Sequence, residues 1–293
     1  MLLTKSFPII FILLWSSAFI TIKPISADAS PFAALAFRFF FVAIGFAIYS
    51  LATNEQLYAE IDKIFKAMIS GILFHGIYLG GVFYAISIGF PVGVTALIVC
   101  LQPILTSVLA GPILNEYISR RQWIGIFLGF FGTVLVLGYD VGTDLSIIGT
   151  LASFIALAAF SFATLWQKKV SEDLPLSVSN AYQALSASCF HIILAILIED
   201  WFINYSSSFL MAMSWQIFAV SFGAFTILMY LIKTGSASKT ASLFFLITPV
   251  SVFMAWIFLN EVITLQDFIG LSVATIGVYI VTQIDDNDRN VGV

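Results

Sequence analysis

His75 and Tyr78 lie three positions apart in the middle of a long apolar run. On a helix this spacing places both side chains on one face, where they are neighbours. Histidine changes charge near neutral pH, so His75 could take part in proton coupling or contact a polar ligand. The alternative is a neutral histidine that is hydrogen-bonded to another helix.

A second polar group combines an amide, a hydroxyl and a proline. Gln102 and Thr106 are four residues apart and share a helix face, and Pro103 interrupts the helical hydrogen bonds beside Gln102. Thr248 and Pro249 repeat the combination of polar residue and proline later in the chain. Paired breaks at matching positions of two halves favour a substrate site between them. The alternative is that both prolines only kink their helices for packing.

Aromatic and hydroxyl side chains extend this list of candidates. Trp15, Trp166 and Tyr230 could line a pathway for apolar or aromatic compounds. Ser17 belongs to a polar stripe on its own helix, although a serine in a helix can also bond back to the preceding turn. These residues complete the substrate pathway that the sequence predicts.

Composition decides what kind of elements position these residues. The chain has 293 residues, of which 60% are apolar and 10% charged, and its mean hydropathy is +1.05. A soluble domain has about 25% charged residues, so a soluble enzyme or binding domain is excluded. The net charge of −4 and the scattered basic residues provide no face for nucleic acid. Cys100 and Cys189 give no disulfide, zinc or redox pattern.

The apolar runs have the length of membrane-spanning helices, which need about 20 apolar residues each. Ten runs of this kind are separated by short polar or turn segments. The predicted spans cover residues 7–23, 32–52, 67–88, 91–113, 122–139, 145–166, 176–198, 214–232, 236–259 and 264–283. We therefore expect an all-α polytopic (multi-pass) membrane protein.

The basic residues predict the orientation of these spans, because short cytoplasmic loops are rich in Lys and Arg. With a cytoplasmic N-terminus, the opposite side has only Lys23. The cytoplasmic side then has Lys5, Lys63, Lys66, Arg120, Arg121, Lys168, Lys169, Lys233, Lys239 and Arg289. Both termini are thus expected to be cytoplasmic. A cleavable signal peptide over the first span is the competing interpretation.

Two residues inside spans need a separate interpretation. Arg38 is the one permanent charge deep in a run, and a charge inside a bilayer usually faces the bundle interior or a wet cavity. Its long side chain could instead reach the headgroups, because it lies only seven residues after Pro31. His191, near the end of its run, is expected to be an interfacial residue.

The chain also repeats itself at an offset of about 145 residues. Residues 89–103 match 235–249, and Leu114-Asn115-Glu116 matches Leu259-Asn260-Glu261. Each copy has five spans, an odd number, so the second copy enters the membrane from the opposite side. Residues 1–140 and 141–293 are therefore predicted to be two inverted-topology repeats, an arrangement typical of secondary transporters. The first span has a counterpart in the second copy, which argues against a signal peptide.

The residues at both ends of these repeats resemble the EamA-type drug/metabolite transporter (DMT) superfamily. The similarity rests on residues 14–19, Arg38 and the two Leu-Asn-Glu segments, and it extends over residues 7–283. Family members often have Gly where this chain has Asn115 and Asn260, and Asn also tolerates the left-handed conformation that ends a helix. The resemblance implies a ten-helix permease or exporter of the bacterial inner membrane that carries small metabolites such as amino acids, without a bound cofactor. It also suggests structural or gating roles for Arg38, Glu116 and Glu261.

These observations favour a secondary transporter that works by alternating access, with a small-molecule substrate and a proton as a candidate coupling ion. Export is favoured by the family resemblance alone. An intramembrane enzyme is disfavoured because the sequence has no HExxH, GxSxG or GxxxxGK motif, and no metal-ligating set. A channel or a scaffold subunit of a membrane complex remains the alternative. The substrate, the direction and the oligomeric state do not follow from the sequence.

Overall fold

Ten helices in the described part of the chain are long and apolar enough to cross a membrane. The computed structural model describes residues 6–90, 92–137, 146–259 and 264–282. Within these ranges the regular elements are helices, and the one β-contact is an isolated bridge between Ala29 and Ile203. The predicted all-α fold with ten spans is confirmed.

Several spans consist of more than one helical element. The elements are α2 (Phe7–Asp28), α3 (Pro31–Ala52), α4 (Ile61–Gly71), η1 (Ile72–Tyr78), α5 (Leu79–Ser87), α6 (Val92–Val99), α7 (Gln102–Leu114), α8 (Arg120–Leu137), α9 (Ile147–Val170), α10 (Leu176–Ile198), α11 (Ser207–Trp215), η2 (Gln216–Ala224), α12 (Phe225–Thr234), α13 (Ala237–Ser242), α14 (Phe244–Leu259) and α15 (Leu265–Thr282).

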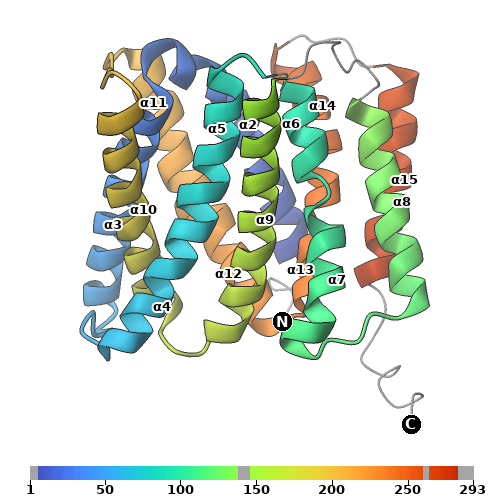
Figure 1. Ribbon diagram of the computed structural model, residues 1–293, viewed down its shortest axis with the longest axis horizontal. Helices are drawn as coiled ribbons and strands as arrows, with labels where there is room; N and C mark the ends of the chain where they lie inside the picture. Colours follow the sequence, from blue (N-terminus) through green and yellow to red (C-terminus); the bar gives the residue numbers. More distant parts are fainter. Residues whose placement is uncertain (1–5, 91, 138–145, 260–263, 283–293) are drawn as a thin grey trace.

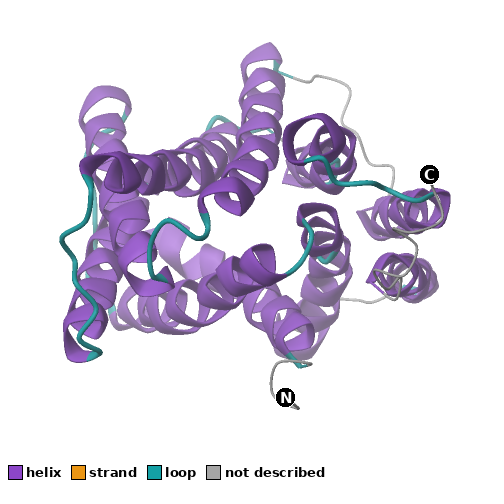
Figure 2. Cartoon of the chain, turned by 90° about the horizontal axis from the view of Figure 1, so that it is seen from below, coloured by secondary structure: helices purple, strands orange, loops and turns teal. Residues whose placement is uncertain are grey.

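Equivalent helices of the two halves pack against each other. The second spans, α3 and α10, lie side by side at one end of the molecule, and the fifth spans, α8 and α15, lie side by side at the other (Figure 1). Between them, α2 contacts α14 and η2 of the second half, and α9 contacts α7 and η1 of the first half. Figure 2 shows the helix bundle from below. The two repeats are thus intertwined around a pseudo-twofold axis.

The α8–α15 pair is held by glycines on both helices. A Cβ added at Gly277 would lie 2.3 Å from the backbone nitrogen of Gly129, and one at Gly132 would lie 2.3 Å from that of Ala274. Small residues at helix crossings in membranes allow this close approach. Gly125 and Gly129 form a GxxxG motif in this contact, and a Cβ at Gly125 would lie 2.7 Å from the carbonyl oxygen of Gly277.

Two π-helical segments occupy matching places in the third and eighth spans. The first, η1, covers Ile72–Tyr78, and the second, η2, covers Gln216–Ala224, which is displaced by about the offset of the repeat. Short π-helical segments are rare and often mark functional sites. Neither segment was predicted from the sequence.

The fourth span is interrupted beside Pro103, as predicted. Its α-helix ends at Val99 and resumes at Gln102, so that the proline takes a place in the first turn of α7, where a missing N–H is tolerated. This span ends at Asn115, whose φ of 56° and ψ of 30° are left-handed. The prediction for Asn115 is confirmed, whereas Asn260 lies outside the described residues.

The ninth span differs from this pattern, and the prediction of a break at Pro249 is wrong. The interruption lies at Leu243, between α13 and α14, and α14 continues through Pro249. Proline cannot donate to the carbonyl four residues earlier, which is that of Phe245. The hydroxyl of Thr133 donates to this carbonyl at 2.9 Å instead. A side chain of α8 therefore lets the helix continue.

Three predicted span ends were also wrong, and one of them is the start of the eighth span, which begins at Ser207 and not at residue 214. The first span does not end at residue 23 but passes Pro24 and continues to Asp28. The third span begins at Ile61 and includes Lys66, which was predicted to belong to the preceding loop. Lys66 forms an ion pair with Asp62 at 2.6 Å, one helical turn away, and such pairs stabilise a helix that extends beyond the apolar core.

Candidate functional site

His75 and Tyr78 both lie in η1 and are buried, with 6% and 9% of their surfaces exposed. The ring centroid of His75 is 4.5 Å from that of Phe39 and 4.3 Å from that of Phe225. Phe39 belongs to α3 and Phe225 begins α12. The imidazole is therefore enclosed by aromatic rings from both halves of the protein.

An aromatic row connects Tyr78 to the first span. Tyr78 stacks on Phe160 of α9 with a centroid distance of 4.1 Å, and Phe160 lies 4.8 Å from Phe244 of α14. Phe244 in turn lies 5.4 Å from Trp15 of α2. The structure thus brings Trp15 and Tyr78 into one contiguous wall made by four different spans.

Gln102 forms a polar centre next to this wall. Its side-chain nitrogen donates to the hydroxyls of Thr106, at 3.0 Å, and Thr164, at 3.2 Å. Thr164 in turn donates to the carbonyl of Phe160, so the polar centre and the aromatic row meet on α9. The Gln102 side-chain oxygen is buried and has no hydrogen-bond partner among the described residues. An unsatisfied buried acceptor is rare and needs an explanation.

Thr248 and Pro249 lie on α14, in the ninth span, next to a contact between α14 and α2. The Ser16 hydroxyl donates to the Ile247 carbonyl at 3.1 Å, and Ser251 donates to the carbonyl of Ser16 at 3.3 Å. Ser16, and not Ser17, is the serine of the first span that faces α14.

Three predicted pathway residues lie away from this centre. Ser17 accepts the indole N–H of Trp215 at 2.8 Å. Trp166 donates to the carbonyl of Lys66 at 3.0 Å, close to the loop end of its span. Tyr230 packs edge-on against Phe7 with a centroid distance of 5.3 Å.

His191 is fully buried, so the prediction of an interfacial residue is wrong. Its Nε2 donates to the carbonyl of His75 at 2.9 Å, and its ring stacks on Phe32 and Phe39. Gly80 leaves room for the imidazole, because a Cβ there would lie 3.2 Å from His191 Cε1. The hydrogen bond joins α10 to the π-helical segment η1.

Arg38 points into the protein. Its Nε donates to the hydroxyl of Ser221 in η2 at 3.0 Å, and its guanidinium carbon lies 5.2 Å from the ring centroid of Phe39. Ser221 is only 3% exposed. It lies fourteen residues after the first residue of α11, whereas Arg38 lies seven residues after the first residue of α3, so Ser221 is the deeper of the two in the bundle. The first residues of α3 and α11 lie at a similar depth, because the backbone N–H of Ser30, directly before α3, donates to the carbonyl of Phe202, shortly before α11. The side chain therefore reaches toward the middle of the bundle and not toward headgroups.

Gln216 is a further buried polar residue in this region, and it was not singled out from the sequence. It begins η2, and its side-chain nitrogen donates to the carbonyl of Ala18 and the hydroxyl of Thr21, both on α2. Gln216 and Arg38 line a cavity of about 20 Å³ between α2, α3, α5 and α11. Gln216 could have been recognised from the sequence as a polar residue in an otherwise apolar run.

Glu116 follows the fourth span and contacts the ninth. Its carboxylate accepts the backbone N–H groups of Ala237 and Ser238, the first two residues of α13. Glu261, its counterpart in the second repeat, lies outside the described residues.

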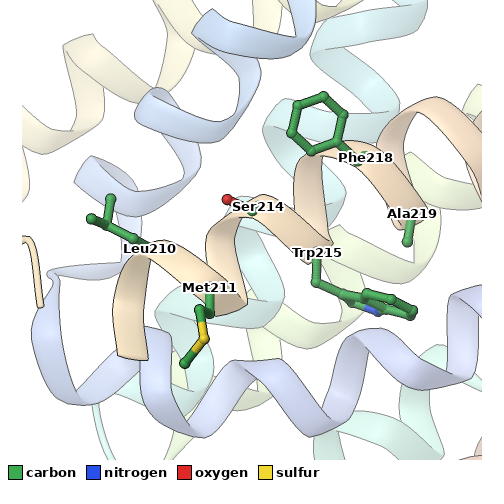
Figure 3. A pocket seen from close by; sticks show the side chains of 6 residues that line it. All are labelled: Leu210, Met211, Ser214, Trp215, Phe218 and Ala219. Atoms are coloured by element: carbon green, nitrogen blue, oxygen red, sulfur yellow. The ribbon is translucent and has the colours of Figure 1, made fainter. Parts of the chain in front are cut away.

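A groove of about 650 Å³ lies on the outer face of α11 and η2 (Figure 3). Met211 and Phe218 on its walls are 70% and 68% exposed, and Trp215 extends from it toward α2. Since these are apolar side chains on a membrane-spanning helix, we assign the groove to the lipid-facing surface. Within the described ranges, no three His, Cys, Asp or Glu side chains are placed to hold a metal ion.

The sequence matches the EamA-like transporter family over residues 6–138 and 147–283. The chain belongs to this family. One matched stretch lies in each predicted repeat, and the interval between them, residues 139–146, includes residues 139–145, which are outside the described ranges. The family supports a multi-pass membrane transporter, a class of protein that binds a small-molecule substrate and sits in a lipid bilayer.

Relatives of the chain are named as transporters. The "Uncharacterized transporter YvbV" of Bacillus subtilis (strain 168) is 28% identical over 208 residues, which cover 70% of this chain and 66% of that protein. An "Uncharacterized transporter" of Archaeoglobus fulgidus is 25% identical over 282 residues, or 92% of this chain and 95% of the relative. A solved crystal structure that is 19% identical superimposes with a TM-score of 0.81 over 95% of this chain and 97% of the other, which supports the fold.

Proposed function

We propose that this family member is a secondary transporter that exports a small metabolite, an amino acid or a related compound, by alternating access. The observation that carries the proposal is the pseudo-twofold packing of the central spans. Each half contributes a π-helical segment, and each segment packs against the first span of the opposite half. Two halves related in this way can exchange conformations, which exchanges the side of the membrane that is open.

The proposed substrate pathway runs through the centre where these spans meet. Gln102 offers an unsatisfied acceptor beside Thr164, and the aromatic row from Trp15 to Tyr78 forms an adjoining wall. Pro103 lies in the first turn of α7, next to Gln102, where the backbone of the fourth span is interrupted. We include the remaining predicted residues as parts of the pathway toward its ends: Ser17, Trp166, Tyr230, Thr248 and Pro249.

The moving units of this mechanism are the two repeats, residues 1–140 and 141–293. Glu116 is proposed to hold the loop end of α7 to the start of α13, a contact that would break and re-form during transport. Glu261 would play the equivalent part at the opposite face. Capping of a helix N-terminus by a carboxylate is strong enough to favour one state and weak enough to be reversible.

A proton is the proposed coupling ion, with His75 as the group that binds it. The imidazole sits between Phe39 of the first half and Phe225 of the second half, so a change in its charge would alter the contact between them. The chain has no phosphate-binding GxxxxGK motif, so a gradient is the proposed energy source.

The proposed location is the bacterial inner membrane, with both termini in the cytoplasm. The excess of Lys and Arg on one side of the predicted spans supports this orientation. A green fluorescent protein fused after Val293 should be fluorescent in cells, whereas a fused alkaline phosphatase should be inactive. The opposite pair of results would reverse the orientation.

Counterflow tests the proposed transport activity. Liposomes that contain the purified protein are preloaded with an unlabelled amino acid, and the uptake of the same amino acid in labelled form is followed. A carrier with an alternating site accumulates the label transiently against its gradient, whereas a channel only equilibrates it. Accumulation of at least one compound is expected. Equilibration without accumulation would favour a channel, and no flux from folded protein would favour a scaffold subunit.

A further inference from the structure

We propose that the cavity at Arg38 and Gln216 binds the zwitterionic head group of an α-amino acid, with the carboxylate on Arg38 and the amino group on Gln216. This inference rests on the proposed transport function and assigns the substrate class to a particular site. We call this site the Arg38 cavity. It is lined by two polar residues, Arg38 and Gln216, and by apolar side chains that include Phe83 and Met213.

Arg38 is a cation without an anion. It takes part in none of the ion pairs found in the described ranges, all of which lie near the loop ends of their helices. A charge within a membrane-spanning bundle is expensive unless an opposite charge or several hydrogen bonds compensate it. Its hydrogen-bond partner among the described residues is a neutral hydroxyl, that of Ser221, and its guanidinium also lies over the Phe39 ring. The missing partner is an anion.

The free donors of Arg38 suit a carboxylate. The one side-chain hydrogen bond that Arg38 makes among the described residues uses Nε. The four N–H groups on the two terminal nitrogens remain, and they form a planar fork that matches the two oxygens of a carboxylate. The apolar walls strengthen the attraction, because charges interact more strongly away from water.

Gln216 adds an acceptor to the same cavity. Both hydrogen bonds of its side chain use Nε2, and the acceptor in one of them is the carbonyl of Ala18, so the orientation of the amide is fixed. Its Oε1 is buried and has no hydrogen-bond partner among the described residues, and the residue is only 4% exposed. An acceptor beside a guanidinium selects a ligand that presents an N–H donor next to an anionic group.

The Arg38 cavity is small. A water molecule needs roughly 10–15 Å³ on this measure, and the cavity measures about 20 Å³. An amino-acid head group is larger than water, so binding requires Met213 or its helix to move, and methionine is the most adaptable apolar side chain. Inorganic phosphate also presents paired oxygens to a guanidinium, so it is the competing anion that the experiment includes.

The experiment compares three forms of one compound. Unlabelled L-leucine, leucinamide (no carboxylate) and 4-methylpentanoate (no amino group) compete for counterflow of labelled L-leucine in liposomes, and L-phenylalanine, its amide and 3-phenylpropanoate form a second series. The melting temperature of the detergent-solubilised protein is measured with each compound and with inorganic phosphate. The expected result for the wild type is a preference of tenfold or more for the amino acid over both analogues.

The variants assign this preference to the Arg38 cavity. Arg38→Gln should abolish the preference for leucine over leucinamide. Arg38→Lys should retain part of this preference, because lysine keeps the positive charge and loses the planar pair of N–H donors. Lys168→Gln is the matched control. It removes a positive charge that caps the carbonyls of Lys233 and Gly235 in another part of the bundle, and it should leave the preference unchanged.

The outcomes separate the head-group site from the transport function. Equal competition by either analogue, an unchanged preference in Arg38→Gln, or stabilisation by phosphate above that by leucine would overturn the site and leave the transporter intact. If no compound is exchanged, stabilisation by amino acids that Arg38→Gln loses would still support the site and contradict transport. Absence of both exchange and stabilisation would overturn both proposals.

Discussion

The Glu116 carboxylate accepts the backbone N–H of Ala237 at 2.9 Å, so the residue that follows the fourth span caps the first turn of the ninth. A second contact joins α7 to α13, where the hydroxyls of Ser107 and Ser238 are 2.5 Å apart. The two interrupted spans of the protein are therefore fastened to each other at this end. The sequence motif that ends the first repeat has a structural role in the second.

Removing this cap should destabilise the protein. Glu116→Ala leaves two N–H groups at the start of α13 without their acceptor, and loss of a helix cap costs about 1 kcal/mol. Glu116→Gln keeps an acceptor oxygen and should therefore lose less stability than Glu116→Ala. Glu172→Ala, at an exposed loop position, is the control and should not change stability. Thermal unfolding in detergent measures the difference. Equal melting temperatures for Glu116→Ala and the control would exclude the capping role.

The apolar runs were sufficient to predict ten spans, because length and hydropathy alone define a helix that crosses a bilayer. They could not predict which side of each helix faces the protein, because lipid and protein interior are both apolar. Ser16 and Ser17 illustrate the point. Both are polar and adjacent, and only the structure distinguishes the one that contacts α14 from the one that meets Trp215.

Contacts between residues that are far apart in the chain also could not be predicted from the sequence. His191 was expected at the interface because it lies near the end of its run, and its burial depends on a carbonyl 116 residues away and on the missing side chain of Gly80. Pro249 was expected to break its helix because the donor from Thr133 is not visible in the local sequence. Asn115 could be predicted because a left-handed helix end is a local property.

Gln102→Leu should reduce transport and change stability little, because removal of the unpaired oxygen offsets the loss of the two hydrogen bonds to Thr106 and Thr164. Leucine fills a similar volume and removes the buried oxygen that has no partner within the described ranges. If that oxygen serves the substrate, counterflow should fall about tenfold or more, as for loss of a buried hydrogen bond of roughly 1.5 kcal/mol. Gln122→Leu is the control. Its oxygen already accepts the N–H of Ser119 at 2.8 Å, so this variant should lose stability and keep transport. Normal counterflow in Gln102→Leu would remove the residue from the pathway.

Gly277→Ala should destabilise the α8–α15 pair by about 1–3 kcal/mol, the usual cost of overpacking. The new Cβ would lie 2.3 Å from the backbone nitrogen of Gly129, and backbone atoms cannot move aside without separating the helices. Gly111→Ala provides the comparison, because its nearest neighbour would be the Glu116 carbonyl at 3.7 Å. That variant should be neutral or slightly stabilising, since alanine is the better helix former. Two variants with the same melting temperature would contradict this packing.

His75→Gln should retain transport and lose its response to a pH gradient. Glutamine keeps hydrogen-bonding capacity at the contact with Phe39 and Phe225 and cannot gain a charge, so a carrier that couples through this imidazole becomes insensitive to the gradient. Counterflow and gradient-driven uptake of the same compound are compared at equal protein loading. His191→Gln is the matched control, because an amide can still donate to the His75 carbonyl from α10. An intact pH response in His75→Gln would exclude this histidine as the coupling group, and loss of the response in His191→Gln alone would transfer the role to His191.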